Sequence, residues 1–164
     1  MSEVTRRVAI GAGGALLAGT MLWPGRVGAA ERFPVTLSDA EWRKRLAPAA
    51  YQVLRHEDTE APFTSPLLKE HRKGTFACAG CTRPLFSSTT KFESGTGWPS
   101  FWAPLKGAVA TKTDGTLGMT RTEVHCPQCG GHLGHVFDDG PKPTGLRYCM
   151  NGIALKFQPE GEAA

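Results

Sequence analysis

Residues 126–129 read Cys126-Pro127-Gln128-Cys129, and 44 residues separate them from an equivalent C-x2-C pair, Cys78-Ala79-Gly80-Cys81, earlier in the chain. Each pair lets one backbone turn present two thiolates, and four sulfurs at the corners of a tetrahedron suit Zn2+. We therefore predict that one structural zinc ion ties distant segments together through Cys78, Cys81, Cys126 and Cys129. Two disulfides are an alternative in an oxidising compartment, although C-x2-C pairs meet disulfide geometry only with strain. A redox-active C-x2-C pair is a further alternative.

The 164-residue chain has the composition of one ordinary globular domain, with 40% hydrophobic and 21% charged residues. Its 20 glycines and 12 prolines favour short elements joined by many turns and exclude a coiled coil. The net charge is +4, and half of it belongs to residues 1–30, which hold Arg6, Arg7 and Arg26 against Glu3. No cluster of lysine and arginine remains, so we expect no nucleic acid or acidic membrane as a partner.

The first thirty residues have the pattern of a signal peptide for export. Arg6 and Arg7 precede an uncharged run over residues 8–23 that is too short and too rich in glycine for a membrane span. Small residues surround Ala29 and Ala30, so we expect cleavage after one of them and no stable membrane insertion. The arginine pair resembles a twin-arginine signal, which directs folded proteins to export and predicts a periplasmic location. The alternative is an uncleaved membrane anchor.

In the mature domain, residues 31–164, the sequence predicts two short helices followed by a small antiparallel β domain. Ser38 and Glu41 form an S-x-x-E capping box at the start of the first helix. Pro48 suits the first position of the second helix. Short apolar or alternating segments between turns predict strands around residues 109–113, 117–125, 146–150 and 153–157.

Cys149 is left over once the paired cysteines are assigned, and an unpaired cysteine in an exported protein calls for a reason. If this segment is extended, Arg147, Cys149 and Asn151 project to one side, which places a guanidinium and an amide beside the sulfur. A positive charge there favours the thiolate, which is a nucleophile. Burial among apolar side chains would instead make Cys149 an inert thiol.

Longer strings of residues resemble those of the zinc-containing methionine-R-sulfoxide reductases, often called the B type. Besides the two C-x2-C pairs, they are Thr59-Glu60-Ala61-Pro62-Phe63-Thr64, Gly95-Thr96-Gly97-Trp98-Pro99-Ser100-Phe101, His132-Leu133-Gly134-His135-Val136-Phe137 and Arg147-Tyr148-Cys149-Met150-Asn151. The resemblance covers essentially the whole mature chain. It implies a mainly β fold of two antiparallel sheets, the β-tent, with a structural zinc ion. It also implies reduction of the R epimer of methionine sulfoxide in proteins.

The resemblance also suggests roles for the side chains around Cys149. Trp98 would form an apolar wall for the methyl group, and Phe137 would lie at the same pocket. Cys149 would attack the sulfoxide sulfur and be left as sulfenic acid. The full set of expected catalytic residues is Cys149, His132, His135, Asn151 and Arg147, and the expected substrate-binding residues are Trp98 and Phe137.

The two histidines are the candidates for an acid, which the reaction needs because a sulfoxide sulfur resists attack until its oxygen is protonated or strongly hydrogen-bonded. His132 and His135 stand three positions apart, which puts them on opposite sides of a straight strand. Gly134 allows a bend that could bring both toward one pocket, but the spacing alone does not settle this. By residue type His125 is an alternative metal ligand beside Cys126, although four sulfurs already complete a zinc shell.

The chain departs from a common pattern of this family at Thr96, where many members carry a second cysteine that resolves the sulfenic acid. With four cysteines on zinc, Cys149 has no internal partner, so we expect a small thiol or a thioredoxin-like protein to recycle it. The other expected partners are oxidised exported proteins, and we expect the enzyme to be a monomer. Two rival interpretations stay open: a zinc-knuckle binding module with a structural Cys149, and a peroxide-reducing or disulfide-exchanging thiol enzyme.

Overall fold

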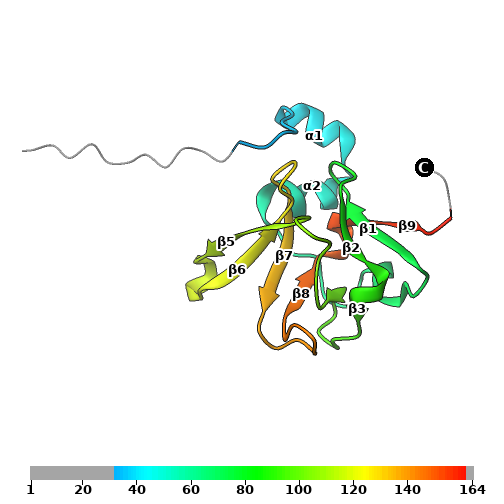
Figure 1. Ribbon diagram of the computed structural model, residues 1–164. Coiled ribbons are helices and arrows are strands. Elements are labelled where there is room, and N and C mark those ends of the chain that lie inside the picture. The colour runs from blue at the N-terminus through cyan, green and yellow to red at the C-terminus, as the bar shows by residue number, and fades with distance from the viewer. Residues whose placement is uncertain (1–31, 162–164) are drawn as a thin grey trace, which may run out of the picture. The chain divides into compact units, whose positions relative to one another are not determined.

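The computed structural model describes residues 32–161, so the predicted signal peptide lies outside the described residues. Within them, two antiparallel sheets stand side by side, and two helices lie at one end of them (Figure 1). This confirms the predicted class, a mainly β fold of two antiparallel sheets with short N-terminal helices. No helix in the described range has the length and apolar character that a membrane span requires.

The two sheets differ in size and share no strand. The smaller one has the order β2-β1-β9 and consists of β1 (Gly74–Cys78), β2 (Pro84–Ser87) and β9 (Leu155–Pro159). The larger one has the order β3-β4-β8-β7-β6-β5 and consists of β3 (Lys91–Phe92), β4 (Ser100–Phe101), β5 (Ala110–Asp114), β6 (Arg121–His125), β7 (His132–Phe137) and β8 (Arg147–Met150). Because β8 belongs to one sheet and β9 to the other, the chain must turn between residues 150 and 155.

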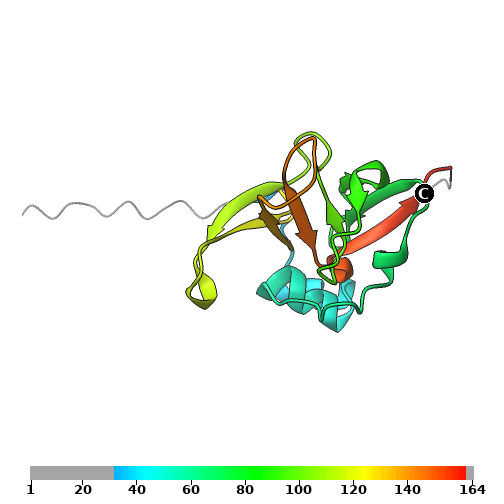
Figure 2. The ribbon, with the colours of Figure 1, turned by 90° about the horizontal axis from the view of Figure 1, so that it is seen from below.

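The helices begin where the sequence predicts. In α1 (Asp39–Arg45) the Ser38 side chain accepts a hydrogen bond from the Glu41 backbone N–H, and the Glu41 carboxylate accepts one from the Ser38 N–H at 2.8 Å. α2 (Pro48–His56) has Pro48 at its first position and buries Tyr51 and Leu54. Viewed from below, both helices lie along one side of the sheets (Figure 2).

Two predicted strands are shorter than expected because turns take their first residues. The segment around 117–125 begins with a 3-10 helix, η3 (Thr116–Gly118), and pairs only from Arg121 onward. The segment around 153–157 begins with η4 (Gly152–Ala154), where the chain passes from β8 to β9. Two further 3-10 helices are η1 (Pro66–Lys69) and η2 (Ser88–Thr90).

An aromatic core braces the strands that carry the site. Phe76, Phe86 and Phe101 are fully buried, and they come from β1, β2 and β4, so they join the two sheets. The ring centroids of Phe86 and Phe101 are 4.4 Å apart and the rings are stacked. Each buried phenylalanine contributes roughly 1.5–3 kcal/mol of hydrophobic stabilisation. β4 in turn pairs with β8, where Ser100 stands opposite Cys149.

Candidate active site and metal centre

The four paired cysteines converge into one buried cluster. Their sulfur atoms all lie within 4.8 Å of one another. The Sγ atoms of Cys78 and Cys129 are 3.7 Å apart, and those of Cys81 and Cys126 are 3.5 Å apart. A tetrahedral metal ion with bonds of about 2.3 Å separates its sulfurs by about 3.8 Å, whereas a disulfide needs about 2.05 Å. The spacing fits a metal centre and contradicts the two-disulfide alternative.

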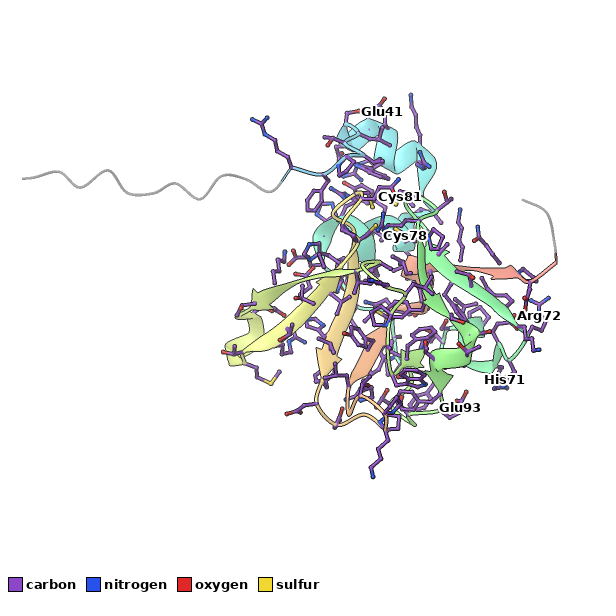
Figure 3. All side chains as sticks on the ribbon, in the orientation of Figure 1. Glu41, His71, Arg72, Cys78, Cys81 and Glu93 are labelled. Carbon is purple, nitrogen blue, oxygen red and sulfur yellow. The ribbon has the colours of Figure 1, made fainter. Side chains whose placement is uncertain are left out.

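The metal centre joins the two sheets at their helical end. Figure 3 shows Cys78 and Cys81, at and just after the end of β1, beside the helices. Cys126 and Cys129 stand in the turn that follows β6 in the larger sheet. The turn closes through a 2.8 Å hydrogen bond from the Gly130 N–H to the Cys126 carbonyl. His125 is not part of this cluster; its ring meets Phe33 edge-on, with 5.9 Å between the ring centroids.

Cys149 lies at a separate cavity of about 120 Å³ on the larger sheet. Cys149 is half-buried, so it is not enclosed in an apolar interior. The cavity brings together five of the predicted site residues and three that were not predicted. They are Trp98, His135, Phe137, Cys149 and Asn151, with Thr59, Arg121 and Gly134.

The strand pairing explains how His135 and Cys149 come together at this cavity. β7 and β8 are antiparallel, and His135 stands directly opposite Cys149. In the pairing of β6 with β7, His125 stands opposite His132, whereas its neighbour Val124 stands opposite Gly134. Leu133 of β7 therefore has no partner in β6 and forms a β-bulge. A bulge reverses the alternation of faces. The rings of His132 and His135 are therefore neighbours, with 5.4 Å between their centroids, but only His135 lines the cavity.

Gly134 also permits close contact between β7 and β8. A Cβ atom placed there would lie 2.1 Å from the Cys149 carbonyl oxygen. Its φ of +153° is one that residues with side chains rarely adopt. Only glycine therefore lets the two strands approach to this distance.

His135 is held by a carboxylate. Its Nε2 lies 2.8 Å from Asp114 Oδ2, which also accepts a hydrogen bond from Arg121 Nη2 at 2.6 Å. Hydrogen bonds, first from the Thr116 backbone N–H, hold the pKa of Asp114 well below its usual range. Because Asp114 is ionised, Nε2 of His135 is the donor and Nδ1 stays available. Burial lowers the pKa of His135, against the opposing effect of the Asp114 hydrogen bond.

His132 lies behind His135 and does not line the cavity. It is buried, and its Nδ1 is 2.9 Å from Oε1 of the buried Glu123. Burial raises the pKa of Glu123, but hydrogen bonds from His132 and Lys112 outweigh burial and lower it overall. Among the described residues, Nε2 of His132 has no hydrogen-bond partner. The charged Glu123 therefore accepts a hydrogen bond from Nδ1 of His132, which keeps the ring proton on Nδ1 and leaves Nε2 without a proton.

Arg147 also stands beside the cavity rather than in its lining. Two nitrogens of its guanidinium, Nε and Nη2, each donate a hydrogen bond to the Asp139 carboxylate at 2.8 Å. The guanidinium carbon lies 4.4 Å from the centroid of the Phe137 ring. The pKa of Arg147 is raised, mainly by the hydrogen bond to Asp139 and further by the Cys149 sulfur. The positive charge is thus close to Cys149, as the predicted extended strand implies.

Glu60 connects Trp98 with Asn151 across the cavity lining, and the sequence alone does not single it out. Its backbone carbonyl accepts from Trp98 Nε1 at 2.9 Å, and its N–H donates to Asn151 Oδ1 at 2.9 Å. Its carboxylate accepts from the Gly152 N–H at 2.7 Å. Asn151 Nδ2 donates to the Leu133 carbonyl at 3.2 Å, which leaves one amide hydrogen for the cavity.

Thr96 occupies the position of the expected second cysteine. Its Oγ1 is 3.8 Å from Cys149 Sγ and 2.9 Å from Ser94 Oγ, which in turn is 2.7 Å from Ser100 Oγ. A hydroxyl group therefore contacts the sulfur where a thiol would be needed for an internal disulfide. None of the four clustered cysteines lines the cavity of Cys149.

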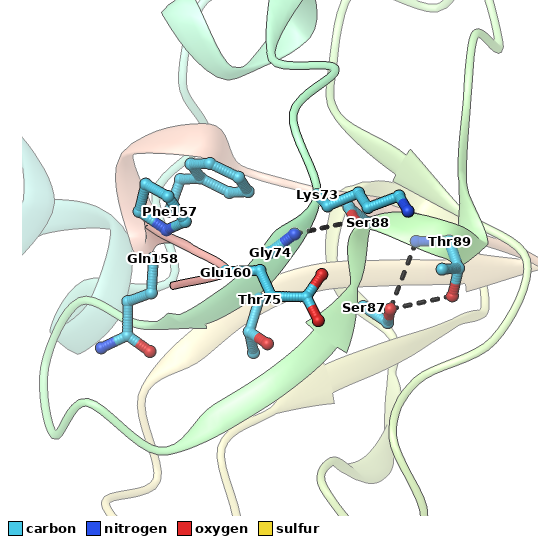
Figure 4. Close-up of a pocket in the computed structure, with 10 residues that line it drawn as sticks. Lys73, Gly74, Thr75, Ser87, Ser88, Thr89, Phe157, Gln158 and Glu160 are labelled. Atoms are coloured by element: carbon cyan, nitrogen blue, oxygen red, sulfur yellow. Dashed lines mark hydrogen bonds between the residues drawn. The ribbon is translucent and has the colours of Figure 1, made fainter. Parts of the chain in front are cut away.

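A wider hollow of about 720 Å³ lies at one end of the strands of the smaller sheet (Figure 4). It contains neither cysteine nor histidine. Several of its hydroxyl groups are engaged locally: Ser88 Oγ accepts from the Gly74 N–H at 3.0 Å, and Ser87 Oγ accepts from the Thr89 N–H at 3.2 Å. Its size alone gives no reason to place chemistry there.

Comparison with known proteins covers both sites. The model of the SelR domain matches residues 46–159, which include the metal cluster and the whole cavity lining. A protein of Leptospira interrogans named peptide methionine sulfoxide reductase MsrB is 56% identical over 129 residues, covering 78% of this chain and 98% of the relative. A protein of Agrobacterium fabrum with the same name is 56% identical over 126 residues, covering 76% and 93%. A third, from Methanosarcina barkeri, is 52% identical over 129 residues, covering 78% and 91%.

Proposed function

The chain belongs to the SelR-domain family of MsrB proteins, and on that premise we propose that it reduces the R epimer of methionine sulfoxide in proteins to methionine. The observation that carries this proposal is the cavity in which the accessible Cys149 sulfur stands opposite His135 and next to the Trp98 wall. A binding module would not need this arrangement of nucleophile and acid. A cavity with an apolar wall also suits a thioether better than a peroxide.

The cavity orients the sulfoxide by contrasting surfaces. Trp98 accepts the methyl group and offers its ring face to it, since its Nε1–H is engaged by the Glu60 carbonyl. An apolar wall gives no partner to the S–O dipole, so the oxygen turns toward His135 and the free amide hydrogen of Asn151. Reversing methyl and oxygen would bury the oxygen against Trp98, which accounts for selection of one epimer.

The reaction then transfers the oxygen to Cys149. The Cys149 thiolate attacks the sulfoxide sulfur while the doubly protonated form of His135 gives the proton on its Nδ1 to the oxygen, and Arg147 supplies a positive charge beside the attacking sulfur. The S–O bond of the substrate breaks, methionine leaves reduced by two electrons, and Cys149 is oxidised to sulfenic acid. Glu123 and His132 position His135 from behind.

Recycling of Cys149 requires an external thiol. The hydroxyl of Thr96 cannot form a disulfide, although it lies 3.8 Å from the sulfur. One thiol condenses with the sulfenic acid, which releases water and forms a mixed disulfide. A second thiol then releases the Cys149 thiolate and leaves with the first as a disulfide. A small thiol or a thioredoxin-like protein supplies both electrons.

The proposed metal is a structural zinc ion held by the four clustered cysteines. Four thiolates leave no open position, so zinc at this centre supplies fold stability rather than chemistry. Residues 1–30 are proposed as a twin-arginine signal, which suits a protein that binds its metal before export. The protein then repairs oxidised proteins in the periplasm as a monomer. N-terminal sequencing of the exported form should begin at Ala30 or Glu31, and an uncleaved N-terminus would contradict this part.

The decisive experiment replaces the nucleophile. Cys149→Ser should abolish reduction of methionine-R-sulfoxide in a peptide while the zinc content stays at one per chain. Cys78→Ser is the matched control, since it removes a thiol from the metal cluster and should lower the zinc content. Retained activity in Cys149→Ser would end the proposal. An intramolecular disulfide to Cys149 after turnover, seen by mass spectrometry, would contradict the external recycling.

A further inference from the structure

A second hollow, of about 230 Å³, adjoins the catalytic cavity, because Trp98 lines both. We propose that this hollow, with Phe63 at its edge, binds an apolar side chain that neighbours the oxidised methionine in the polypeptide substrate. This proposal rests on the proposed function, and it adds a determinant of which methionine sulfoxides are reduced.

The side chain of Phe63 is exposed to solvent, and its backbone conformation is fixed by a hydrogen bond. Its side chain is 71% exposed, and its φ of +66° is in the left-handed region that bulky residues avoid. The Phe63 N–H donates to the Gly97 carbonyl at 2.8 Å, which fastens this conformation to the loop that carries Trp98. The left-handed backbone of Phe63 and the exposure of its aromatic ring to water both cost free energy. Such backbone outliers concentrate where ligands bind.

Gly97 makes the contact between the two segments possible. A Cβ atom there would lie 2.8 Å from Cβ of Pro62 and 3.1 Å from the Phe63 ring, and its own φ is +95°. The segment of Phe63 and the loop of Trp98 are therefore packed as one unit. Because Trp98 lines both hollows, a peptide that places its sulfoxide against Trp98 can reach Phe63 with a neighbouring side chain.

The chemistry of the hollow suits an apolar side chain followed by an acidic one. The half-buried Leu68 and Phe92 line the hollow together with Phe63 and Trp98 and supply apolar surface. Lys69 and His71 stand exposed at its rim, while Lys91 is already paired with Glu93 at 3.2 Å. Figure 3 shows His71 and Glu93 at the end of the domain opposite Cys78 and Cys81, so this surface is separate from the metal centre. The rim therefore favours acidic over basic residues farther along the peptide.

The test compares three substrates that carry the same methionine-R-sulfoxide. They are the N-acetyl methylamide, a pentapeptide with glycine on both sides of the sulfoxide, and a pentapeptide with leucine on both sides. We expect the wild-type protein to prefer the leucine peptide over the glycine peptide in kcat/KM. Phe63→Ala should reduce this preference by about tenfold, because the leucine loses its apolar contact. Leucine peptides ending in Asp should also be favoured over those ending in Lys.

Two further variants keep the result interpretable. Phe63→Asn also removes the ring but tolerates the left-handed backbone, so it should lose the preference even if Phe63→Ala is unstable. Met119→Ala is the matched control, because Met119 is the other exposed large hydrophobic side chain among the described residues, at 55%, and lines neither hollow. It should keep the preference for leucine.

The outcomes separate this inference from the proposed function. If the wild-type protein reduces the methylamide but shows no preference for leucine, or if Phe63→Asn keeps the preference, the subsite is overturned and the reductase stands. If the wild-type protein reduces none of the three substrates, the proposed function fails and the subsite with it.

Discussion

Gly134→Ala should damage the protein more than a single added methyl group normally does. The new Cβ would stand 2.1 Å from the Cys149 carbonyl oxygen and 3.0 Å from Met150 Cα, where ordinary contacts begin at 3.4 Å. Both neighbours are backbone atoms, so no side-chain rotation can relieve the overlap. β7 and β8 must separate by about 1 Å or more, which opens the ladder between Gly134–Met150 and His135–Cys149.

The expected cost follows from these losses. Overpacking of this kind costs about 1–3 kcal/mol, and two weakened backbone hydrogen bonds add about 1 kcal/mol each. We therefore expect Gly134→Ala to lower the free energy of unfolding by about 3–5 kcal/mol, out of a typical total of about 5–15 kcal/mol. The loss of activity should exceed what unfolding alone would cause, because a displacement of a reacting group by about 1 Å can lower the rate about a hundredfold.

Urea unfolding followed by tryptophan fluorescence measures the stability, with the zinc content of both proteins matched. Gly115→Ala is the control, since a Cβ atom at Gly115 meets nothing within 4 Å and its φ is −103°. It should change stability by less than about 0.5 kcal/mol. If Gly134→Ala costs less than about 1 kcal/mol and keeps full activity, β7 and β8 are not held at the distance described, and the reasoning is wrong.

Two further predictions concern residues behind the cavity. Glu60→Ala leaves the Gly152 N–H without its acceptor, so it should lower the free energy of unfolding in urea by about 1–3 kcal/mol and raise KM by loosening Trp98 and Asn151. Glu60→Gln keeps an acceptor and should recover most of the stability and most of the wild-type KM. Equal losses in the two variants would contradict this. Asp114→Asn removes the negative charge that helps to raise the pKa of His135, so an NMR titration should find the already lowered pKa of His135 lower still. Because the unfolded chain then takes up the proton first, stability should be lost as pH falls below about 6.5, and a raised pKa would refute the assignment.

The elements that the sequence predicts best are those with local chemical signals. The capping box at Ser38 and the proline at position 48 mark the starts of α1 and α2 within the chain itself. β1 and β2 escape prediction because each is a short run in which consecutive residues are buried, so no alternation of polar and apolar residues appears. The turn at η4 also escapes, since it serves the change from one sheet to the other.

The site divides in the same way. Cys149, Trp98 and the cysteine pairs are conspicuous as residue types in distinctive strings. Glu60 acts mainly through backbone groups and a contact with Gly152 far along the chain, so no property of its side chain signals its position. Asp114 reaches His135 only because β5, β6 and β7 are neighbours in the larger sheet.

The bulge in β7 connects these levels of structure. Without the extra residue, His132 and His135 would face opposite sides of the sheet, and the histidine held by the buried Glu123 would not contact His135. With it, the ion pair of Lys112 and Glu123 at 2.9 Å extends through His132 to the ring beside Cys149. The metal cluster ends three residues before His132, so it anchors the strand just ahead of the bulge. The cysteine cluster can therefore hold His132 and His135 in place while remaining outside the cavity that Cys149 lines.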